Sequence, residues 1–244
     1  MGFRDRLVSS SKQHESRVVL ALDVTGPPHT RSERAAKVLR ELTGGIAGVK
    51  VNLQLLLPRG LEGISEVASI CSDNGLPLIA DVKLNDIEST NLDAVELLFG
   101  NGMDAVIANP FVGFDEGLSG VIHRARALDK GVILLVYMSH AGAKEGYGIK
   151  VGGEPLYLEF ARRVRDWEAD GAIVSSRSLQ AISQVRKILG RDRLILSPGV
   201  GTQGGEGGNA VKAGTDFAIV GRSIIDSSEP ARALQNLNRS MPAP

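Results

Sequence analysis

Two carboxylates and an ammonium stand close together in the run Asp81-Val82-Lys83-Leu84-Asn85-Asp86, directly after an apolar segment. If that segment is a β-strand, Asp81 and Lys83 lie on one face, roughly 7 Å apart along the backbone. Such a pair could stabilise a developing charge and deliver a proton. Alone, the run is more typical of a strand that ends in a polar loop, with Asp86 capping the next helix. It indicates a reactive site only if other strands bring charges to the same place.

Two earlier apolar segments also end in charge. Asp23 ends the segment Val18–Asp23, and Lys50 lies near the end of Ile46–Val51. Either charge alone would be an ordinary loop residue. Three successive segments that end in this way favour one charged site built from all three.

Two glycine-rich runs, Ser197–Gly205 and Gly221–Ser223, follow later apolar segments. Glycines let backbone N–H groups approach an anion closely. Arg222, in the second run, adds a permanent charge that can bind an anion through two hydrogen bonds. The alternative is a pair of flexible surface loops, but two such runs, one of them with an arginine, favour a phosphate site.

Eight short apolar segments alternate with segments of helical spacing, which predicts a single-domain (β/α)₈ TIM barrel of the α/β class. In such barrels the C-terminal strand ends carry the reactive groups, and the loops after strands seven and eight often bind phosphate. An open doubly wound sheet is the competing architecture, but the turn after the first segment lacks its G-x-G-x-x-G fingerprint. The predicted strands are Val18–Asp23, Ile46–Val51, Leu78–Val82, Asp104–Ala108, Gly131–Tyr137, Gly171–Val174, Leu194–Ser197 and Phe217–Val220.

The segments between the strands are predicted to be helices, among them Leu61–Asn74 and Gly117–Leu128. The small and polar stretch Ser139–Gly148 is expected to be a long loop, either a lid or a surface excursion. Residues 1–17 would be an N-terminal extension or a short helix, and residues 18–240 would form the barrel.

The 244 residues carry a formal net charge of zero, from 28 basic and 28 acidic side chains. This balance provides no general attraction for nucleic acid, so any anion must be held by a local site. Cys71 is the only cysteine, and no apolar stretch approaches the length of a membrane span. The N-terminus has no apolar signal-peptide region. We therefore expect a cytoplasmic protein without a membrane partner.

Taken in order, these motifs resemble those of the orotidine 5′-phosphate decarboxylase family, particularly its compact archaeal type, over nearly the whole chain. The motifs are Leu22-Asp23, Val49-Lys50-Val51-Asn52, Asp81–Asp86 continuing through Ile87-Glu88-Ser89-Thr90-Asn91, Met138-Ser139-His140, Ser197–Gly205 and Val220-Gly221-Arg222. Three positions depart from the family pattern: Glu88 stands where many members have proline, Asn109 where many have histidine, and Thr202 where alanine is common.

The resemblance implies a homodimer that converts orotidine 5′-phosphate to UMP and CO₂, the final step of de novo pyrimidine nucleotide synthesis, without a metal or an organic cofactor. It also implies shared active sites, in which Lys50, Asp81 and Lys83 surround the reacting carbon and the partner chain contributes Asp86. The other implied substrate contacts are Asp23 and Thr90 on the ribose, with Thr90 crossing the dimer interface, Ser139 and Gln203 on the pyrimidine, and Arg222 with the loop positions Pro198, Gly201 and Gly221 around the phosphate.

Two other functions stay open at this point. Mg²⁺-dependent sugar-phosphate lyases, of the 3-keto-L-gulonate 6-phosphate decarboxylase or hexulose-phosphate synthase type, share D-x-K-x-x-D. A resemblance to these lyases would imply an acidic residue on the second strand. This chain has Lys50 at that position, and its ammonium would repel a divalent ion. A non-catalytic nucleotide-binding barrel would keep Arg222 and the glycine-rich runs, but it would not need the charged array.

Overall fold

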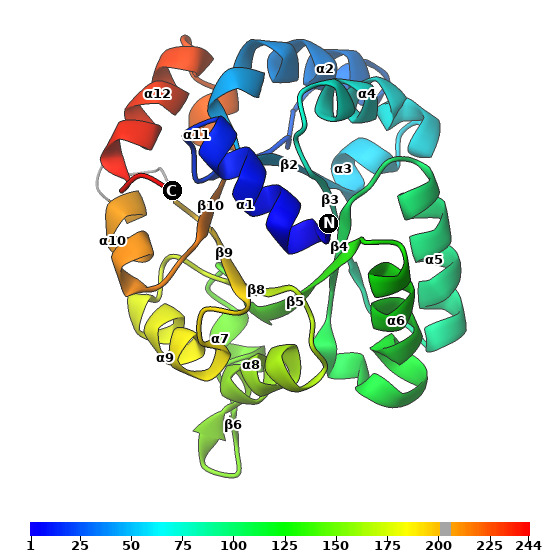
Figure 1. Ribbon diagram of the computed structural model, residues 1–244, viewed down its shortest axis with the longest axis vertical. Helices are drawn as coiled ribbons and strands as arrows, with labels where there is room; N and C mark the ends of the chain where they lie inside the picture. Colours follow the sequence, from blue (N-terminus) through cyan, green and yellow to red (C-terminus); the bar gives the residue numbers. More distant parts are fainter. Residues whose placement is uncertain (201–205) are drawn as a thin grey trace.

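Eight parallel strands close into a barrel in the computed structural model, which describes residues 1–200 and 206–244 (Figure 1). Helices surround the barrel, so the predicted TIM barrel is confirmed. Around the barrel the strand order is β1-β10-β9-β8-β5-β4-β3-β2. The strands are β1 Val18–Ala21, β2 Gly48–Asn52, β3 Leu78–Leu84, β4 Ala105–Ala108, β5 Gly131–Tyr137, β8 Gly171–Val174, β9 Leu194–Pro198 and β10 Phe217–Val220.

The longer helices lie outside the strands, except α1, which crosses one end of the barrel (Figure 1). They are α1 Phe3–Gln13, α2 Arg31–Leu42, α4 Ser65–Asp73, α5 Glu88–Gly100, α6 Ser119–Ala127, α8 Leu156–Asp166, α9 Leu179–Leu189, α10 Glu206–Ala213 and α12 Pro230–Ser240. Shorter helical turns lie in the connections between the strands. They are η1 Pro28–Thr30, η2 Thr43–Gly45, α3 Leu53–Leu56, η3 Leu61–Ile64, η4 Pro110–Val112, η5 Phe114–Leu118, α7 Ala143–Gly146 and α11 Arg222–Ile225.

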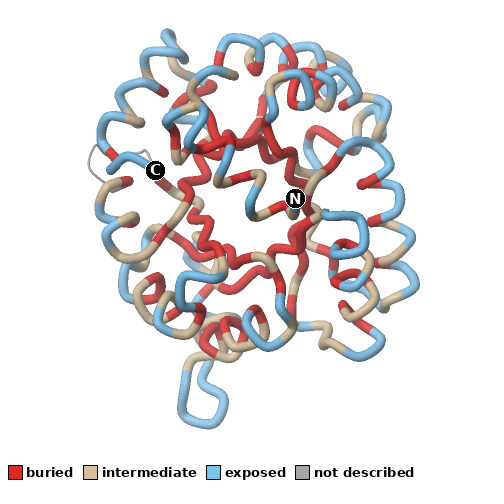
Figure 2. The backbone as a smooth tube through the Cα atoms, in the orientation of Figure 1, coloured by how far each residue is buried: buried red, intermediate tan, exposed pale blue. Residues whose placement is uncertain are grey.

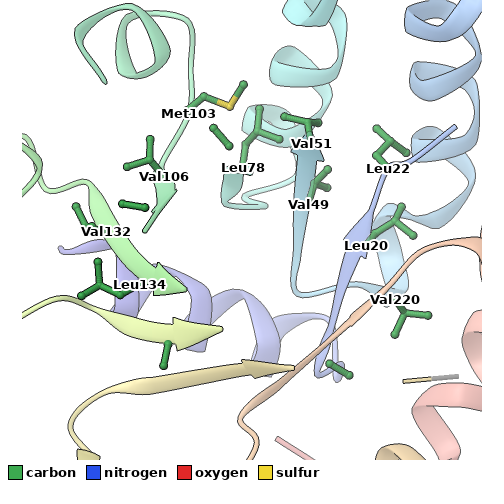
Figure 3. Close-up of a cluster of buried hydrophobic side chains, with 14 of the residues drawn as sticks. Leu20, Leu22, Val49, Val51, Leu78, Met103, Val106, Val132, Leu134 and Val220 are labelled. Atoms are coloured by element: carbon green, nitrogen blue, oxygen red, sulfur yellow. The ribbon is translucent and has the colours of Figure 1, made fainter. Parts of the chain in front are cut away.

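Alternate residues of each strand enter two separate cores, because successive side chains of a strand point to opposite faces. On β1, Val18 and Leu20 pack outward against the helices, whereas Val19 faces the barrel axis. Both faces are therefore apolar, as expected for a parallel sheet covered on both sides. Figure 2 shows that the barrel strands are mostly buried. Figure 3 shows part of the outer core, where Leu20, Val49 and Leu78 come from three neighbouring strands.

Helix α1 closes the N-terminal end of the barrel. Its side chains Phe3 and Leu7 are fully buried and belong to the inner core with Val19 and Ile79. The Phe3 ring lies directly over Gly131, where even a Cβ atom would overlap it. The N-terminal residues 1–17 thus cover the inner core at the N-terminal ends of the strands.

Several local predictions were incomplete. The predicted helix Leu61–Asn74 is a turn of 3₁₀ helix, η3, followed by α4, and the predicted helix Gly117–Leu128 starts at Ser119 after the irregular segment η5. The expected loop after β5 contains α7. It is followed by an exposed hairpin of β6 Lys150–Val151 and β7 Glu154–Pro155, which projects from the barrel (Figures 1 and 2). Within residues 1–200 and 206–244, no helix is both long and apolar enough to cross a membrane.

The contact between Phe3 and Gly131 gives a test of how α1 is held. We predict that Gly131→Ala lowers the free energy of unfolding by about 1–3 kcal/mol, because the new methyl group displaces the Phe3 ring in a packed core. In a Phe3→Ala background the same change should cost much less, since the ring is gone. Denaturant unfolding of the four proteins measures the coupling. Gly44→Ala is the matched control, because nothing lies within 4 Å of a Cβ at Gly44. Equal costs in both backgrounds would contradict the contact.

Candidate active site

A cavity of about 330 Å³ opens among the C-terminal ends of the barrel strands. Apolar side chains of the inner core form its floor, including Ile107, Leu135 and Ile173. Its polar walls come from the strand ends and the loops that follow them. The polar side chains and close-packed loop residues that line it are Asp23, Lys50, Asn52, Asp81, Lys83, Ser139, Arg177, Pro198, Gly199, Gly221, Arg222 and Ser223.

A wider hollow of about 980 Å³ lies at the other end of the barrel, between the ends of α1, α2 and α12. Reactive groups of TIM barrels lie at the C-terminal ends of the strands, whereas the opposite face contributes to stability. The cavity at the strand C-termini is therefore the candidate active site.

Asp81 lies between two lysines in this cavity. Its Oδ1 accepts a hydrogen bond from Lys83 Nζ at 2.7 Å, and its Oδ2 lies 3.1 Å from Lys50 Nζ. The side chain of Lys50 is only 6% exposed and that of Asp81 14%, whereas that of Lys83 is 38% exposed. One carboxylate thus neutralises a buried ammonium and holds a second ammonium that faces the cavity.

The pKa of Asp81 lies below its ordinary value. Burial acts in the opposite direction and favours the neutral acid, but the charges and hydrogen bonds of Lys50 and Lys83 outweigh it. Asp81 is therefore ionised at neutral pH.

The strand is irregular where it carries Lys83. Four steps along β3, from Ala80 to Leu84, correspond to two steps along β4, from Val106 to Ala108. Lys83 itself has a φ of +49°, in the left-handed region that costs a non-glycine residue about 1–3 kcal/mol. Simple alternation along a regular strand, which the sequence pattern assumed, therefore does not describe this segment. The bulge bends the chain so that Lys83 reaches Asp81.

Asn52 holds Asp23 beside the lysines. The Oδ1 of Asn52 accepts the backbone N–H of Gln54 at 2.9 Å, so its amide nitrogen faces the cavity and donates to Asp23 Oδ1 at 2.7 Å. The same oxygen of Asp23 lies 3.5 Å from Lys50 Nζ. The C-terminal ends of β1, β2 and β3 thus form one connected polar network, as the sequence predicted for Asp23, Lys50, Asp81 and Lys83.

Arg222 and Arg177 lie on the part of the cavity wall formed after β8, β9 and β10. Arg222 begins the short helix α11 after Gly221, whose backbone approaches β1 so closely that a Cβ would lie 2.9 Å from the Ala21 carbonyl oxygen. Arg177 follows β8 near Gly199, which has a φ of +95°. Two cations and closely packed backbone therefore line this wall.

The structure brings together Asp23, Lys50, Asp81, Lys83, Ser139, Pro198, Gly221 and Arg222 of the predicted site residues. Asp86 and Thr90 are exposed at the start of α5 and do not line the cavity of this chain. The predicted positions Gly201 and Gln203 lie outside the described residues. Sequence reasoning did not assign Asn52 or Arg177. Asn52 is spaced two residues from Lys50 on the same strand, and this spacing could have identified it.

Among the residues that the structure describes, no three side chains of His, Cys, Asp or Glu are grouped so that they could hold a metal ion. In the candidate site the two carboxylates, Asp23 and Asp81, both face Lys50.

Comparison with known proteins identifies the family of this chain. Residues 16–237 match the family described as orotidine 5′-phosphate decarboxylase / HUMPS. The chain belongs to this family. It is 37% identical to the orotidine 5′-phosphate decarboxylase of Thermococcus kodakarensis over 223 residues, which cover 91% of this chain and 95% of that protein. It is 32% identical to that of Methanococcoides burtonii over 225 residues, covering 92% and 97% of the two chains.

A solved structure supports the same family assignment. The crystal structure of orotidine 5′-phosphate decarboxylase from Pyrococcus horikoshii OT3 matches with a TM-score of 0.78 and 34% sequence identity, covering 92% of this chain and 98% of that one. The family resemblance inferred from the motifs is confirmed. The present chain forms a single closed barrel, in which Asp81 lies between Lys50 and Lys83.

The lowered pKa of Asp81 predicts how stability depends on pH. A carboxyl group whose pKa falls on folding adds stability above its unfolded pKa of about 3.9, and that stability is lost as pH falls through the folded pKa. The difference in unfolding free energy between the wild type and Asp81→Asn should therefore be constant above roughly pH 5 and change below about pH 4, with the wild type losing more stability. Denaturant unfolding from pH 7 downward measures it. The exposed Asp93→Asn variant is the control, and an Asp81→Asn curve parallel to the wild type would contradict the ion pairs.

Proposed function

We propose that this protein decarboxylates orotidine 5′-phosphate to UMP and CO₂, the final step of de novo pyrimidine nucleotide synthesis. The observation that carries the proposal is the cavity in which Asp81 holds two lysines while Arg222 lies on another wall. Relatives of at least 32% identity over nearly the whole chain are orotidine 5′-phosphate decarboxylases, which supports the same activity.

The charged cluster suits the chemistry of this reaction. Loss of CO₂ from a pyrimidine ring carbon leaves an electron pair in the plane of the ring, where ring resonance cannot spread it. A neighbouring ammonium can stabilise that charge and donate the proton that replaces CO₂. We assign this role to Lys83, because its ammonium is the more exposed of the two. Lys50 would keep Asp81 ionised, and Asp81 would keep Lys83 in place.

The remaining cavity residues would bind the nucleotide. We assign the phosphate to Arg222 with Pro198 and Gly221, together with the sequence-predicted Gly201, and add Arg177 as a second cation. Asp23 would bind ribose hydroxyls, and Ser139 with the sequence-predicted Gln203 would contact the pyrimidine. Binding the phosphate away from the reacting carbon supplies binding energy that can orient the ring.

We further propose that the reaction needs no metal or organic cofactor. The Mg²⁺-dependent sugar-phosphate lyases are the alternative within the same superfamily. Lys50 argues against them, since its ammonium lies against Asp81 and Asp23, the carboxylates that a divalent ion would require. A binding protein without activity would not need these charges.

A decarboxylation assay separates the three functions. We predict that the ultraviolet absorbance of orotidine 5′-phosphate is lost in the presence of the protein at the same rate before and after exhaustive chelation. Turnover that disappears with EDTA and returns with Mg²⁺ would contradict cofactor independence and favour the sugar-phosphate lyases. Tight UMP binding without any turnover would favour the binding protein.

We propose a homodimer in which Asp86 and Thr90 complete the partner's active site. Four large apolar side chains are exposed on the turns that follow β2, β3 and β4, at the same end as the cavity. This rim patch consists of Leu53 (46% exposed), Leu57 (74%), Ile87 (63%) and Phe111 (68%). Asp86 adjoins Ile87 and is exposed although it follows the reactive strand β3. A second copy of the chain on this patch would bury the apolar side chains and bring Asp86 to the neighbouring cavity.

Mixed dimers test the shared site. Lys83→Ala and Asp86→Ala homodimers should each be inactive. After subunit exchange, each mixed dimer has one site that lacks both groups and one intact site. With equal amounts, about half of the dimers are mixed, so roughly a quarter of the wild-type activity should return.

The matched control for this exchange is Lys83→Ala mixed with Asp81→Ala. Those two groups lie on one strand of one chain, so no intact site forms and no activity should return. Mixed dimers of Lys83→Ala and Asp86→Ala that are seen by mass spectrometry but stay inactive would show that Asp86 acts within its own chain.

The cytoplasmic location stays a prediction from the single cysteine.

A further inference from the structure

Asn91 is a buried amide that joins two backbone segments near Asp86. It lies in the first turn of α5 with only 1% of its surface exposed. Its Nδ2 donates to the carbonyl oxygen of Asp86 at 2.5 Å and to that of Gly117 at 3.2 Å. Both acceptors are carbonyl oxygens, so only the NH₂ group can face them, and each of its two hydrogens has one acceptor. Asn91 therefore ties the turn after β3 to the segment that precedes α6.

Glu88 makes a second tie between the same two regions. Ser119 Oγ donates to Glu88 Oε2 at 3.2 Å, at the N-terminus of α6, where the helix dipole favours a carboxylate. Gly120 leaves the space that the carboxylate occupies, because a Cβ there would overlap it. The start of α5 is thus fixed to the start of α6 by two side chains.

These ties act on the main chain beside the exposed side chain of Asp86. The Oδ1 of Asp86 accepts the backbone N–H of Ile87 at 2.8 Å, which orients the carboxylate relative to its own backbone. Asn91 in turn fixes that backbone through the Asp86 carbonyl. The Asp86 carboxylate is exposed on this chain, whereas its backbone carbonyl is bound by a buried amide five residues away.

We propose that Asn91 is a positioning residue for Asp86. It holds the main chain of the Asp86 turn so that the carboxylate enters the active site of the second copy of the chain. This inference rests on the proposed function, in which Asp86 acts in the partner's site. A residue that works through Asp86 must serve the partner's cavity and not the cavity of its own barrel.

Subunit exchange separates this role from a general structural one. The Asn91→Ala homodimer should have a kcat at least fivefold below that of the wild type, with KM changed less than kcat. Mixed with Lys83→Ala, it should regain activity, because one site of each mixed dimer then has Lys83 from one chain and a correctly held Asp86 from the other. Mixed with Asp86→Ala, it should regain none. The reverse pattern would show that Asn91 serves its own barrel, and recovery in neither or in both mixtures would also overturn the proposal.

Asn101→Ala is the matched control. Asn101 follows the same helix, and its Nδ2 donates to one carbonyl, that of Leu97, at 2.8 Å, on an exposed surface. This variant should keep the wild-type kcat. If Asn91→Ala does not fold, Asn91→Ser, whose hydroxyl can donate to only one of the two carbonyls, replaces it in the same mixtures. Failure of both variants to fold would assign Asn91 to folding alone and overturn the proposal.

Amide hydrogen exchange tests the tie without any activity. Peptides that span residues 85–91 and 113–119 should exchange faster in Asn91→Ala than in the wild type, and unchanged in Asn101→Ala. If the wild type does not decarboxylate orotidine 5′-phosphate, the proposed function fails while this readout still tests the tie. Unchanged exchange in Asn91→Ala would overturn the positioning role itself.

Discussion

The carboxylate of Asp81, shared by two ammonium groups, is the interaction on which the candidate site depends. Lys50 is almost wholly buried, and an isolated ammonium at that depth would lose its hydration without compensation. Asp81 is buried as well, and the two charges compensate each other. The same carboxylate holds Lys83, which faces the cavity. The ammonium of Lys83, which the proposed reaction uses, is therefore held by the same carboxylate that compensates the buried charge of Lys50.

The barrel makes this arrangement possible because its strand ends converge. Parallel pairing places Asn52 beside Asp81 and Ala21 beside Lys50, so Asp23, Lys50 and Asp81 meet without any long loop. The outer core holds the helices against the strands, and α1 closes the end opposite the cavity. The later strands β8, β9 and β10 deliver the arginines to a wall of their own. Phosphate binding and charge stabilisation can therefore act on different ends of one nucleotide.

Much of the fold and of the candidate site could be predicted from the sequence, because the strands and the charges at their ends follow short-range patterns. Apolar segments such as Val18–Asp23 identified the strands, and the residues at their ends identified the charged site, since strand ends of a barrel share one rim. The glycine-rich runs after the later strands indicated Arg222 as an anion-binding residue. The predicted strand limits differed from those in the structure by a few residues. For example, β3 continues past the predicted end at Val82, through the bulge, to Leu84.

The features that were missed depend on contacts between residues distant in the sequence. The packing of Phe3 over Gly131 joins residues 128 positions apart, and no local pattern reports it. The left-handed backbone of Lys83 follows from the register of β3 against β4. Asn91 resembled an ordinary helix residue until its contact with Gly117 was visible. Arg177 has no motif around it, and only the fold brings it to the cavity.

The most direct test of the central claim is the turnover of Lys83→Ala, followed as release of labelled CO₂ from carboxyl-labelled orotidine 5′-phosphate. If Lys83 stabilises the carbanion and donates its proton, the folded variant should bind UMP and release almost no CO₂. A variant that keeps more than about a tenth of the wild-type rate, a loss of less than about 1.4 kcal/mol in barrier stabilisation, would contradict the account.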